Sequence, residues 1–374
     1  MADTADISQP AVAPAKTAPS PIISNTPVLN HSQDAFTPSK HLAFKEMPKV
    51  HTMKDLGFSE TTGVSHIAVS EPFNLFTEEA VMRMRQEILR PEVLDNCKYS
   101  SNLADCYLRG FATKYAPFVY DVWKNPETLA IVSKIAGIDL VPEMDLEIAH
   151  VNISMKSEET KKEELEAVAE KANYEADEGI GGCPWEDDKP IVDWHTDSYP
   201  FVCVTMLSDC ANMVGGETAL RTGNGDIMKV RGPQMGCAVV LQGRYIEHRA
   251  LRALGMTERI TMVTSLRPRN PLVRDDTVLT TVRPISNIND LYNQFTEYRL
   301  QILEERIRLQ LKEIHDLSAA GRRVPTKKLK AFFEEQEKFL AHMNNEMVYD
   351  EDVIAGDIQQ TLITLTGRTV QGAA

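Results

Sequence analysis

Short segments rich in β-branched residues, in the middle of the chain, constrain its fold more than any other feature. They cover residues 146–154, 201–207, 217–221, 235–241 and 259–266, with turns between them at Gly215-Gly216, Gly223-Asn224-Gly225 and Gly232-Pro233. Strands of this length and spacing are typical of an antiparallel sandwich or barrel, whereas parallel α/β sheets need a helix between successive strands. We therefore expect a mainly β core.

Helical patterns precede this core. Residues 73–89 carry an apolar stripe with Thr77 as the N-cap, and residues 117–136 predict two short helices that are interrupted at Pro126 and followed by Gly137 as a C-cap. The expected fold class is therefore α+β, with N-terminal helices flanking the β core.

A second helical region follows the core. Residues 290–317 and 326–347 repeat apolar side chains at helical spacing, and Gly321 and Pro325 separate the two runs. These runs predict a C-terminal helical hairpin. Its apolar face is interpreted as packing on the core, with a dimer contact as the alternative, so both a monomer and a homodimer stay open.

Composition divides the chain further. Residues 1–40 contain six prolines among Ala, Ser and Thr, which predicts a disordered or surface-draped tail. We assign residues 41–145 to a support region of helices and strands and residues 146–270 to the β core. Residues 271–374 form the C-terminal helical region and tail.

An acidic segment interrupts the core. Residues 156–188 hold 12 acidic and 4 basic side chains, so a charge of −8 lies in this one stretch. Such a run is interpreted as a solvated, partly helical insertion. The alternative is a mobile lid, because the segment leads directly into the polar residues discussed next.

Charge and hydropathy exclude several classes of protein. The 374 residues carry 40 basic and 54 acidic side chains, a net charge of −14, which does not suit a nucleic-acid binder. No apolar run is long enough to cross a membrane, and the polar N-terminus resembles no secretory or transit signal. The cysteines form no CxxC pair and are expected to be reduced thiols, at positions 97, 106, 183, 203, 210 and 237. We expect a cytoplasmic protein.

One triplet and one distant histidine suggest a metal site. In the extended segment Asp193-Trp194-His195-Thr196-Asp197, side-chain alternation places His195 and Asp197 on the same face. His248 is the histidine in the later strand-rich region. Two imidazoles and one carboxylate on one face of a metal form the facial triad of non-haem Fe(II) oxygenases, and the absence of a thiolate disfavours structural zinc.

A possible anion clamp follows at the head of the last strand. In Arg259-Ile260-Thr261, alternation places the guanidinium and the hydroxyl on the same face. Arg donates two parallel hydrogen bonds to a carboxylate, and a hydroxyl can add a third. An ordinary surface arginine is the alternative interpretation of this position.

Together these residues resemble one family. The order His195-x-Asp197, His248 and Arg259-x-Thr261 is similar to the Fe(II)/2-oxoglutarate-dependent dioxygenases. Gly215-Gly216-Glu217 and the turn from Gly232-Pro233 to Gly236 also fit, and His248-Arg249 matches the branch that resembles isopenicillin N synthase. The resemblance covers about residues 145–270, and it implies a double-stranded β-helix, also called a jelly roll.

The resemblance also implies roles for individual residues. His195, Asp197 and His248 would hold Fe(II), while Arg259 and Thr261 would bind the distal carboxylate of 2-oxoglutarate. The branch often has serine at the position of Thr261, and the hydroxyl is kept here. Asn152 is either a second contact to 2-oxoglutarate or a structural amide.

The implied activity is oxidation of a C–H bond of a small molecule by O2, with 2-oxoglutarate converted to succinate and CO2. Hydroxylation, desaturation and oxidative ring closure all fit, whereas halogenation would need the position of Asp197 vacated. The nearest resemblances are fungal enzymes of secondary metabolism and amino-acid oxidation, including a group that closes an aziridine ring. No nucleic-acid or membrane partner is expected.

Further candidates and rival functions stay open. Arg244, Arg249 and Arg252 could meet a substrate carboxylate, or each could form an ordinary surface ion pair. One rival is an iron oxidase of the isopenicillin N synthase type, which needs no 2-oxoglutarate. The other is a catalytically silent jelly roll that binds a small molecule or a partner protein.

Overall fold

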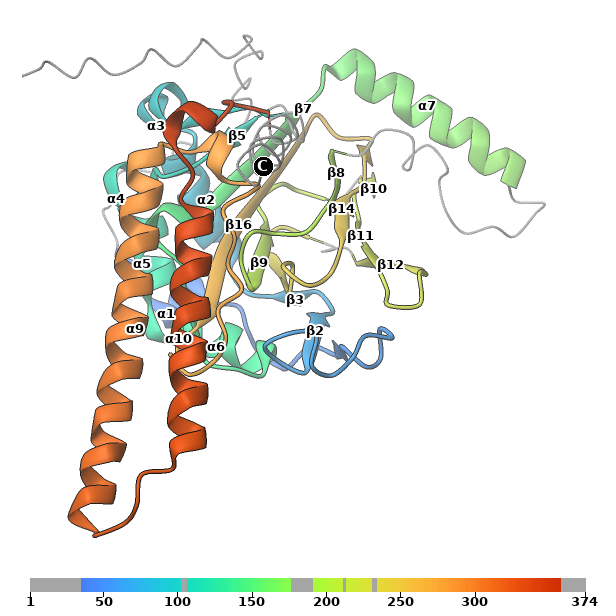
Figure 1. Ribbon diagram of the computed structural model, residues 1–374. Helices are drawn as coiled ribbons and strands as arrows, with labels where there is room; N and C mark the ends of the chain where they lie inside the picture. Colours follow the sequence, from blue (N-terminus) through green and yellow to red (C-terminus); the bar gives the residue numbers. More distant parts are fainter. Residues whose placement is uncertain (1–34, 102–105, 176–190, 211–212, 231–233, 358–374) are drawn as a thin grey trace, which may run out of the picture.

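The computed structural model describes residues 35–101, 106–175, 191–210, 213–230 and 234–357 (Figure 1). Most of the predicted tail, the Gly232-Pro233 turn, Cys183 and the end of the acidic segment lie outside these residues. The strands are β1 (Val50–Thr52), β2 (Ile67–Ser70), β3 (Phe73–Asn74), β4 (Lys98–Tyr99), β5 (Tyr107–Leu108), β6 (Leu140–Pro142), β7 (His150–Met155), β8 (Val192–His195), β9 (Phe201–Met206), β10 (Val214–Gly215), β11 (Thr218–Arg221), β12 (Ile227–Val230), β13 (Cys237–Leu241), β14 (His248–Ala250), β15 (Ala253–Leu254) and β16 (Glu258–Pro268).

The helices lie mainly before and after these strands. They are α1 (Pro38–His41), α2 (Glu78–Ile88), α3 (Pro91–Asn96), α4 (Ala112–Tyr115), α5 (Pro117–Lys124), α6 (Pro126–Ala136), α7 (Glu158–Glu175), α9 (Ile288–Ala319) and α10 (Thr326–Glu346), with 3₁₀ turns η1 (Asp145–Glu147), η2 (Arg283–Ile285) and η3 (Asp350–Asp352). Within the described residues, no helix combines the length and apolar character needed to cross a bilayer.

Two sheets build the core. The larger has the strand order β1-β2-β13-β9-β16-β7-β5-β4, with β3 beside β13 and β6 beside β16, and the smaller has the order β12-β11-β14-β8. β10 and β15 form a separate short pair. Every pairing between described strands is antiparallel, as the short strands predicted. The long strand β16 pairs with β7 and β9, so its side chains lie near the middle of the larger sheet.

The N-terminal helices pack against the larger sheet. Side chains of α2, α5 and α6 share one buried cluster with β7, β9, β13 and β16. Thr77 accepts a hydrogen bond from the backbone of Ala80 and caps α2, and Gly137 ends α6 with a φ of 69°. Both caps and the interruption at Pro126 were predicted correctly.

Two boundaries differ from the sequence prediction by more than two residues. Residues 73–74 belong to strand β3 instead of the helix, because Phe73 pairs with Ala238 and its side chain enters the core. The predicted strand 146–154 begins only at His150. Before it, η1 turns the chain, and Ala149 has a left-handed φ of 62° that breaks the extended backbone.

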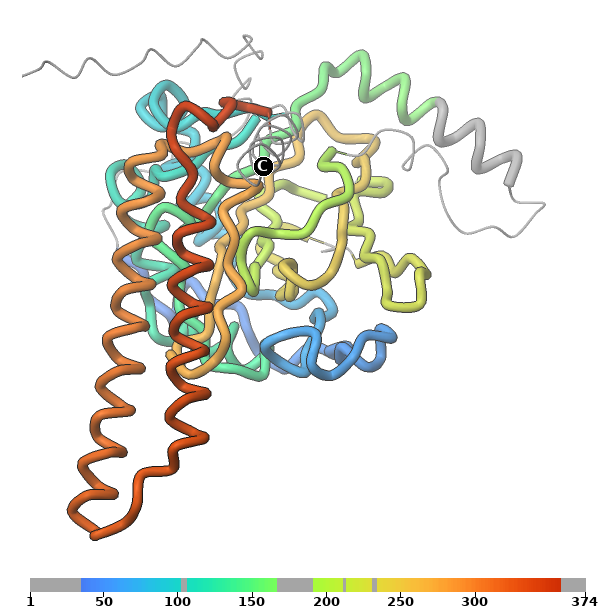
Figure 2. The backbone as a smooth tube through the Cα atoms, viewed as in Figure 1, coloured from blue at the N-terminus to red at the C-terminus, as the bar shows by residue number. Residues whose placement is uncertain are grey.

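The C-terminal hairpin forms as predicted and packs on the core. Its helices α9 and α10 extend together well beyond the sheets (Figures 1 and 2). Near the core the hairpin forms one cluster with residues around η1 and η2, through Leu291, Phe295, Tyr298, Ile302, Phe339 and Met343. The dimer contact stays a prediction.

The acidic segment begins as helix α7, which projects away from the sheets in Figure 1. Glu164 anchors its first turns, because its carboxylate forms ion pairs with Lys156 at 2.8 Å and with Arg252 at 2.5 Å. The helical part of the prediction is therefore correct for residues 158–175. Lid movement stays a prediction.

A buried carboxyl lies where the hairpin meets the core. Thr277 donates a hydrogen bond of 3.0 Å to Glu143 Oε1, and the hydroxyl of Tyr298 is a second hydrogen-bonding neighbour of this carboxyl. Asp275 stands nearby, paired with Arg299 of α9. Burial, and then the charge of Asp275, raises the pKa of Glu143 to about 8.

This carboxyl should make stability depend on pH. The folded protein keeps a proton that the unfolded chain releases above a pKa of 4.5, so the stability linked to it is complete below that pH and is lost as pH rises to about 8. Glu143→Gln imitates the protonated carboxyl. Its advantage over the wild type should grow with pH, to on the order of a few kcal/mol in mildly alkaline buffer. Thermal unfolding of both proteins at acidic, neutral and alkaline pH measures this, and a constant difference would contradict it.

Candidate metal and carboxylate site

A cavity of about 140 Å³ lies between the two sheets. Its walls come from β5, β7, β9 and β16 of the larger sheet and from β8, β11 and β14 of the smaller one. The apolar part of the lining consists mainly of valines. The polar part includes all six site residues predicted from the sequence, His195, Asp197, His248, Arg259, Thr261 and Asn152. The structure therefore brings the predicted set together around one cavity.

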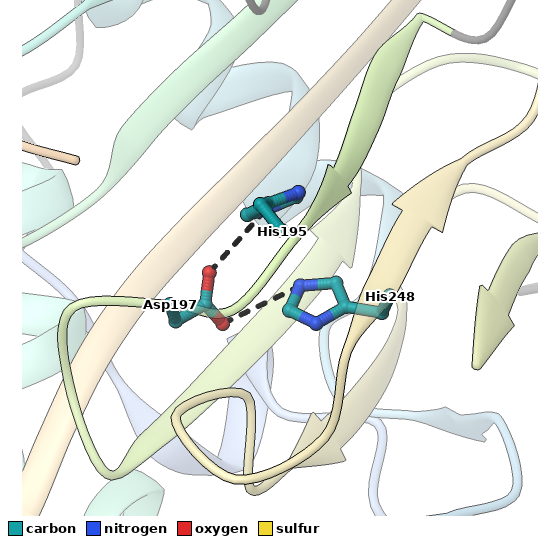
Figure 3. Close-up of side chains that lie close together, drawn as sticks. All are labelled: His195, Asp197 and His248. Carbon is teal, nitrogen blue, oxygen red and sulfur yellow. Dashed lines mark ion pairs between the residues drawn. The ribbon is translucent and has the colours of Figure 1, made fainter. Parts of the chain in front are cut away.

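His195, Asp197 and His248 converge at one point of this cavity (Figure 3). Strands β8 and β14 are paired with His195 opposite His248, so the two imidazoles face each other. Asp197 Oδ1 lies 3.6 Å from His195 Nε2, and Asp197 Oδ2 lies 3.5 Å from His248 Nε2. One potential ligand atom from each residue lies within 4.8 Å of the others, which suits a single metal ion.

The backbone sets the orientation of both imidazoles. His195 Nδ1 is 2.7 Å from the carbonyl oxygen of Asp193, and His248 Nδ1 is 2.8 Å from that of Ile246. A carbonyl oxygen can only accept, so each Nδ1 carries the hydrogen. In the neutral ring the lone pair is then on Nε2, the atom that faces Asp197. Metal-binding histidines are commonly oriented by such a hydrogen bond.

The electrostatics of the site favour a cation. Burial by itself would raise the pKa of Asp197, but His248 and His195 hold it well below its usual value. Burial would also lower the pKa of His248, yet Asp197 outweighs this effect and raises it. The ionised carboxylate thus attracts protons onto the imidazole, and a metal ion at the same point would replace them.

A glycine that was not predicted positions the carboxylate. Strand β8 ends at His195, and Asp197 then turns inward because its backbone N–H donates a hydrogen bond of 2.9 Å to the carbonyl of Gly243. A Cβ at Gly243 would overlap the carboxylate of Asp197. Only glycine leaves room for the carboxylate in this position.

Gly243→Ala should therefore weaken metal binding without unfolding the core, because the added methyl group displaces Asp197. Titration of the purified protein with Co(II), followed by its visible absorption, measures the affinity. Gly225→Ala is the matched control, since its Cβ meets nothing and its φ of 89° strains only a distant turn. Equal affinity of Gly243→Ala and wild type would show that Asp197 does not need this space.

Arg259 and Thr261 lie on the same face of β16, as predicted. Both are buried, and both line the main cavity and a smaller apolar cavity of about 40 Å³ next to it. The only hydrogen bond of Arg259 among the described residues is a long one, 3.4 Å to the carbonyl of Gly216, and its Nε has no partner there. Burial lowers the pKa of Arg259 to about 10, so the side chain stays charged at neutral pH. Among the described residues no carboxylate is within ion-pair distance of Arg259, and the charge of Glu217 offsets only part of the effect of burial on its pKa.

Asn152 is adjacent to this clamp. It stands opposite Thr261 in the pairing of β7 with β16, and opposite Tyr107 on its other side. Its Oδ1 is buried, and the imidazole of His150, two positions earlier on the same strand, is a hydrogen-bonding neighbour of its side chain. The assignment of Asn152 to 2-oxoglutarate stays a prediction.

A buried ionic network in the same cavity was missed by sequence reasoning. Both guanidinium Nη atoms of Arg109 bind the carboxylate of Glu147, and the hydroxyl of Tyr199 donates to the same carboxylate at 2.6 Å. Arg109 Nη1 also lies 3.1 Å from His150 Nδ1. No motif marks these residues. The available signal was a pair of ionisable residues, Glu147 and His150, in a segment expected to be buried.

The three arginines near His248 turn to other partners. Arg244 donates to the carbonyl of Asp276, and Arg252 pairs with Glu164. Arg249 stacks on the ring of Trp194, 4.8 Å from its centre, and does not line the cavity. Contact with a substrate carboxylate, one of the two interpretations of these residues, is thus not supported by their positions.

Comparisons with known proteins give only distant similarity. No protein-family model matches the chain, and no curated protein matches its sequence. A prolyl-4-hydroxylase from Pseudomonas putida overlaps 58% of this chain and 97% of its own, with 14% identity and a TM-score of 0.35. The non-haem α-ketoglutarate-dependent epimerase SnoN from nogalamycin biosynthesis overlaps 54% and 78%, with 13% identity and a TM-score of 0.37. The non-haem monooxygenase ThoJ overlaps 56% of this chain and 77% of its own, with 11% identity and a TM-score of 0.32. Scores at this level assign no activity, so function has to be inferred from the site.

Proposed function

We propose that this protein is a non-haem Fe(II)- and 2-oxoglutarate-dependent oxygenase that oxidises a C–H bond of a small molecule. One observation supports the proposal above all. Two imidazole Nε2 atoms and one carboxylate converge in the same cavity that contains the buried cation Arg259, whose one hydrogen bond among the described residues is long. The proposal includes the jelly-roll arrangement of the two sheets and membership of the isopenicillin N synthase-like branch.

The residues fit both groups that this activity needs. Two nitrogen ligands and one carboxylate on one face are the donor set of non-haem Fe(II), and they leave coordination positions for other molecules. Asp197 Oδ2 is buried and lies 3.5 Å from His248 Nε2, so the carboxylate and the imidazole direct their potential ligand atoms to the same point. Arg259 with Thr261 fits the distal carboxylate of 2-oxoglutarate, because a buried guanidinium needs an anionic partner.

The chemistry divides between the iron and the protein. Bound iron would supply the activation of O2, with 2-oxoglutarate providing two electrons and leaving as succinate and CO2. The side chains of this protein do the positioning. Arg259 and Thr261 hold the far end of the cosubstrate, and the carbonyls of Asp193 and Ile246 keep the imidazoles aimed at the metal. The valines of the cavity wall, Val192, Val202, Val204 and Val263, keep bulk water away from the reacting atoms.

A small-molecule substrate suits the size of the cavity. Most of the lining is buried within the two sheets, and the cavity of about 140 Å³ has to hold the cosubstrate as well, which leaves room only for a small substrate. Our proposal is an amino acid or a small secondary metabolite. Hydroxylation, desaturation and ring closure all stay within the proposal, since each begins with a C–H bond near the metal.

Succinate formation tests the proposal. Anaerobically purified protein is mixed with Fe(II), 2-oxoglutarate and O2, and succinate is measured against the same mixture without iron. We expect slow, iron-dependent succinate release even without substrate, and none from His248→Ala. If no succinate forms but the protein consumes O2 without 2-oxoglutarate, the iron oxidase is favoured. Absence of both activities from an iron-loaded protein would favour the silent binding protein.

A further inference from the structure

The far part of the C-terminal hairpin keeps many apolar side chains exposed. The buried side chains of α9 end at Arg306, and the helix continues to Ala319, well past the sheets (Figures 1 and 2). Exposed apolar side chains gathered on one element mark an interaction surface. Within the described residues, half of the exposed large hydrophobic side chains belong to the two helices: Leu300, Ile307, Leu309, Leu311, Phe333 and Leu340.

Three of these side chains form one line along α9. Leu300, Ile307 and Leu311 follow one another at steps of seven and four residues, which places them on the same face of the helix. Leu291 and Phe295, which pack on the core, lie on the opposite face of α9. The exposed line is therefore directed away from the core.

Helix α10 adds a second line on the same side. Phe333 and Leu340 are seven residues apart, so they are also aligned along their helix. The two helices meet where Arg306 contacts Gln336 and the ring of Phe339. On each helix the exposed line lies about a quarter-turn from this contact, in the direction that brings both lines to the side away from the core. We use the name outer face for Leu300, Ile307, Leu311, Phe333 and Leu340.

Charges of opposite sign lie at the two ends of the hairpin. Its far end, residues 317–333, carries five basic side chains and no acidic one. Its end at the core, residues 288–298 and 344–352, carries six acidic side chains and no basic one, and Asp350 and Glu351 among them are exposed. A second hairpin packed in the same direction would bring like charges together. One packed in the opposite direction brings each basic end to an acidic end.

The apolar side chains fit the same antiparallel arrangement. Because Arg306 contacts Gln336, Ile307 lies at the same level along the hairpin as the midpoint between Phe333 and Leu340. A two-fold axis at this level packs α9 on α9 and α10 on α10, in opposite directions. It places Ile307 beside Ile307 of the second copy, and Phe333 against Leu340 of the second copy. Both lines of the outer face thus require the same axis.

The outer face is also large enough for a specific contact. The 21 residues of α10 span about 30 Å, and two adjacent helices are about 20 Å wide, so packing would cover roughly 600 Å² on each copy. The total of about 1,200 Å² reaches the lower end of the range for stable protein–protein interfaces.

We propose that the outer face is a dimer interface for a second copy of this chain, packed antiparallel about a two-fold axis at Ile307. The four helices form a bundle in which the apolar lines of the two copies cover each other. The basic far end of each hairpin lies against the acidic end of the other. The interface is separate from the cavity, so this proposal does not rest on the proposed function.

Sedimentation equilibrium of the full chain measures the dimer. The wild type should be dimeric at micromolar concentration. Ile307→Glu should raise the dissociation constant by about a hundredfold or more, because it places two carboxylates side by side at the axis. The helix content by circular dichroism should not change, since this side chain is exposed in the single chain.

The matched control is Leu309→Glu. Leu309 is on the same helix and has nearly the same exposed fraction as Ile307, 42% against 43%, but it lies on the other side of α9. This variant should stay dimeric. A dimer that Leu309→Glu disrupts as strongly as Ile307→Glu would overturn the assignment of the outer face.

A charge exchange tests the direction of packing. Arg322→Glu with Arg323→Glu should weaken the dimer several-fold, because acidic side chains then meet the acidic end of the second copy. Adding Asp350→Arg and Glu351→Arg to the same chain should restore it. Failure of the second pair of changes to restore the dimer would overturn the antiparallel arrangement.

Two further results would overturn the whole proposal. One is a wild type that stays monomeric even at high micromolar concentration, whether or not its hairpin binds a different protein. The other is a dimer that Ile307→Glu leaves intact. Succinate release is measured separately, so an active monomer would contradict the dimer alone, and an inactive dimer would contradict the oxygenase alone.

Discussion

Replacing His248 with alanine is expected to abolish stoichiometric Fe(II) binding and all iron-dependent turnover. The change leaves one imidazole and one carboxylate, and two ligands cannot hold a hard divalent ion in competition with water. The fold should survive, since the side chain of His248 lines the cavity and, among the described residues, its Nδ1 bonds only the nearby carbonyl of Ile246. Iron content after anaerobic loading and desalting, together with the unfolding temperature, measures both effects. His195→Ala should behave in the same way.

Controls separate ligand loss from general damage. His51→Ala removes an imidazole that pairs with Glu71 outside the cavity, and it should keep full iron content. Asp197→Gly should also lose oxygenation, although added chloride could then enter the position that the carboxylate leaves. Full activity of His195→Ala or His248→Ala would mean that the wrong ligands have been assigned.

Arg259→Ala is expected to weaken 2-oxoglutarate by roughly thirty-fold or more. Arg259 is buried, and its one hydrogen bond among the described residues is long. Replacing Arg259 with alanine therefore leaves the distal carboxylate of 2-oxoglutarate desolvated and without a partner. Losing such a partner costs on the order of 2–5 kcal/mol, and about 1.4 kcal/mol corresponds to a factor of ten. The 2-oxoglutarate dependence of succinate release measures the change.

Graded substitutions test the geometry of the clamp. Arg259→Lys should recover only part of the affinity, because an ammonium cannot make two parallel hydrogen bonds to one carboxylate. Thr261→Val should cost about 1 kcal/mol, the value of a single hydroxyl hydrogen bond. If the 2-oxoglutarate dependence of Arg259→Ala equals that of the wild type, Arg259 does not bind the cosubstrate. Substrate turnover by the wild type without any 2-oxoglutarate would favour the iron oxidase.

The parts of the site that could be predicted are those carried by short-range geometry. Arg259 and Thr261 share a face because side chains alternate along a strand, and this rule needs no knowledge of the rest of the fold. The caps at Thr77 and Gly137 were predictable for the same reason, since each depends on hydrogen bonds or dihedral angles within one turn. His195 and Asp197 were assigned by the same alternation, but the strand ends at His195, and a contact with Gly243 turns Asp197 inward instead.

The parts that could not be predicted depend on contacts between distant segments. Arg109, Glu147, His150 and Tyr199 form no motif, and they meet only because β5, η1, β7 and the turn before β9 surround one end of the cavity. Gly243 is an ordinary turn glycine in the sequence. Its requirement appears only when Asp197 is placed against it, 46 positions away in the chain.

By itself, the sequence determined the types of side chain available and the local period that places them on one face of a strand or helix. That was enough to predict an antiparallel β core and a C-terminal hairpin, and to select three side chains that converge in the cavity. The tertiary structure alone decided which charged side chains around the cavity lose water, among them Arg259, Arg109 and Glu147. Desolvation depends on everything that surrounds an atom in space, and most of those neighbours are far away in the chain, so local patterns contain no record of it.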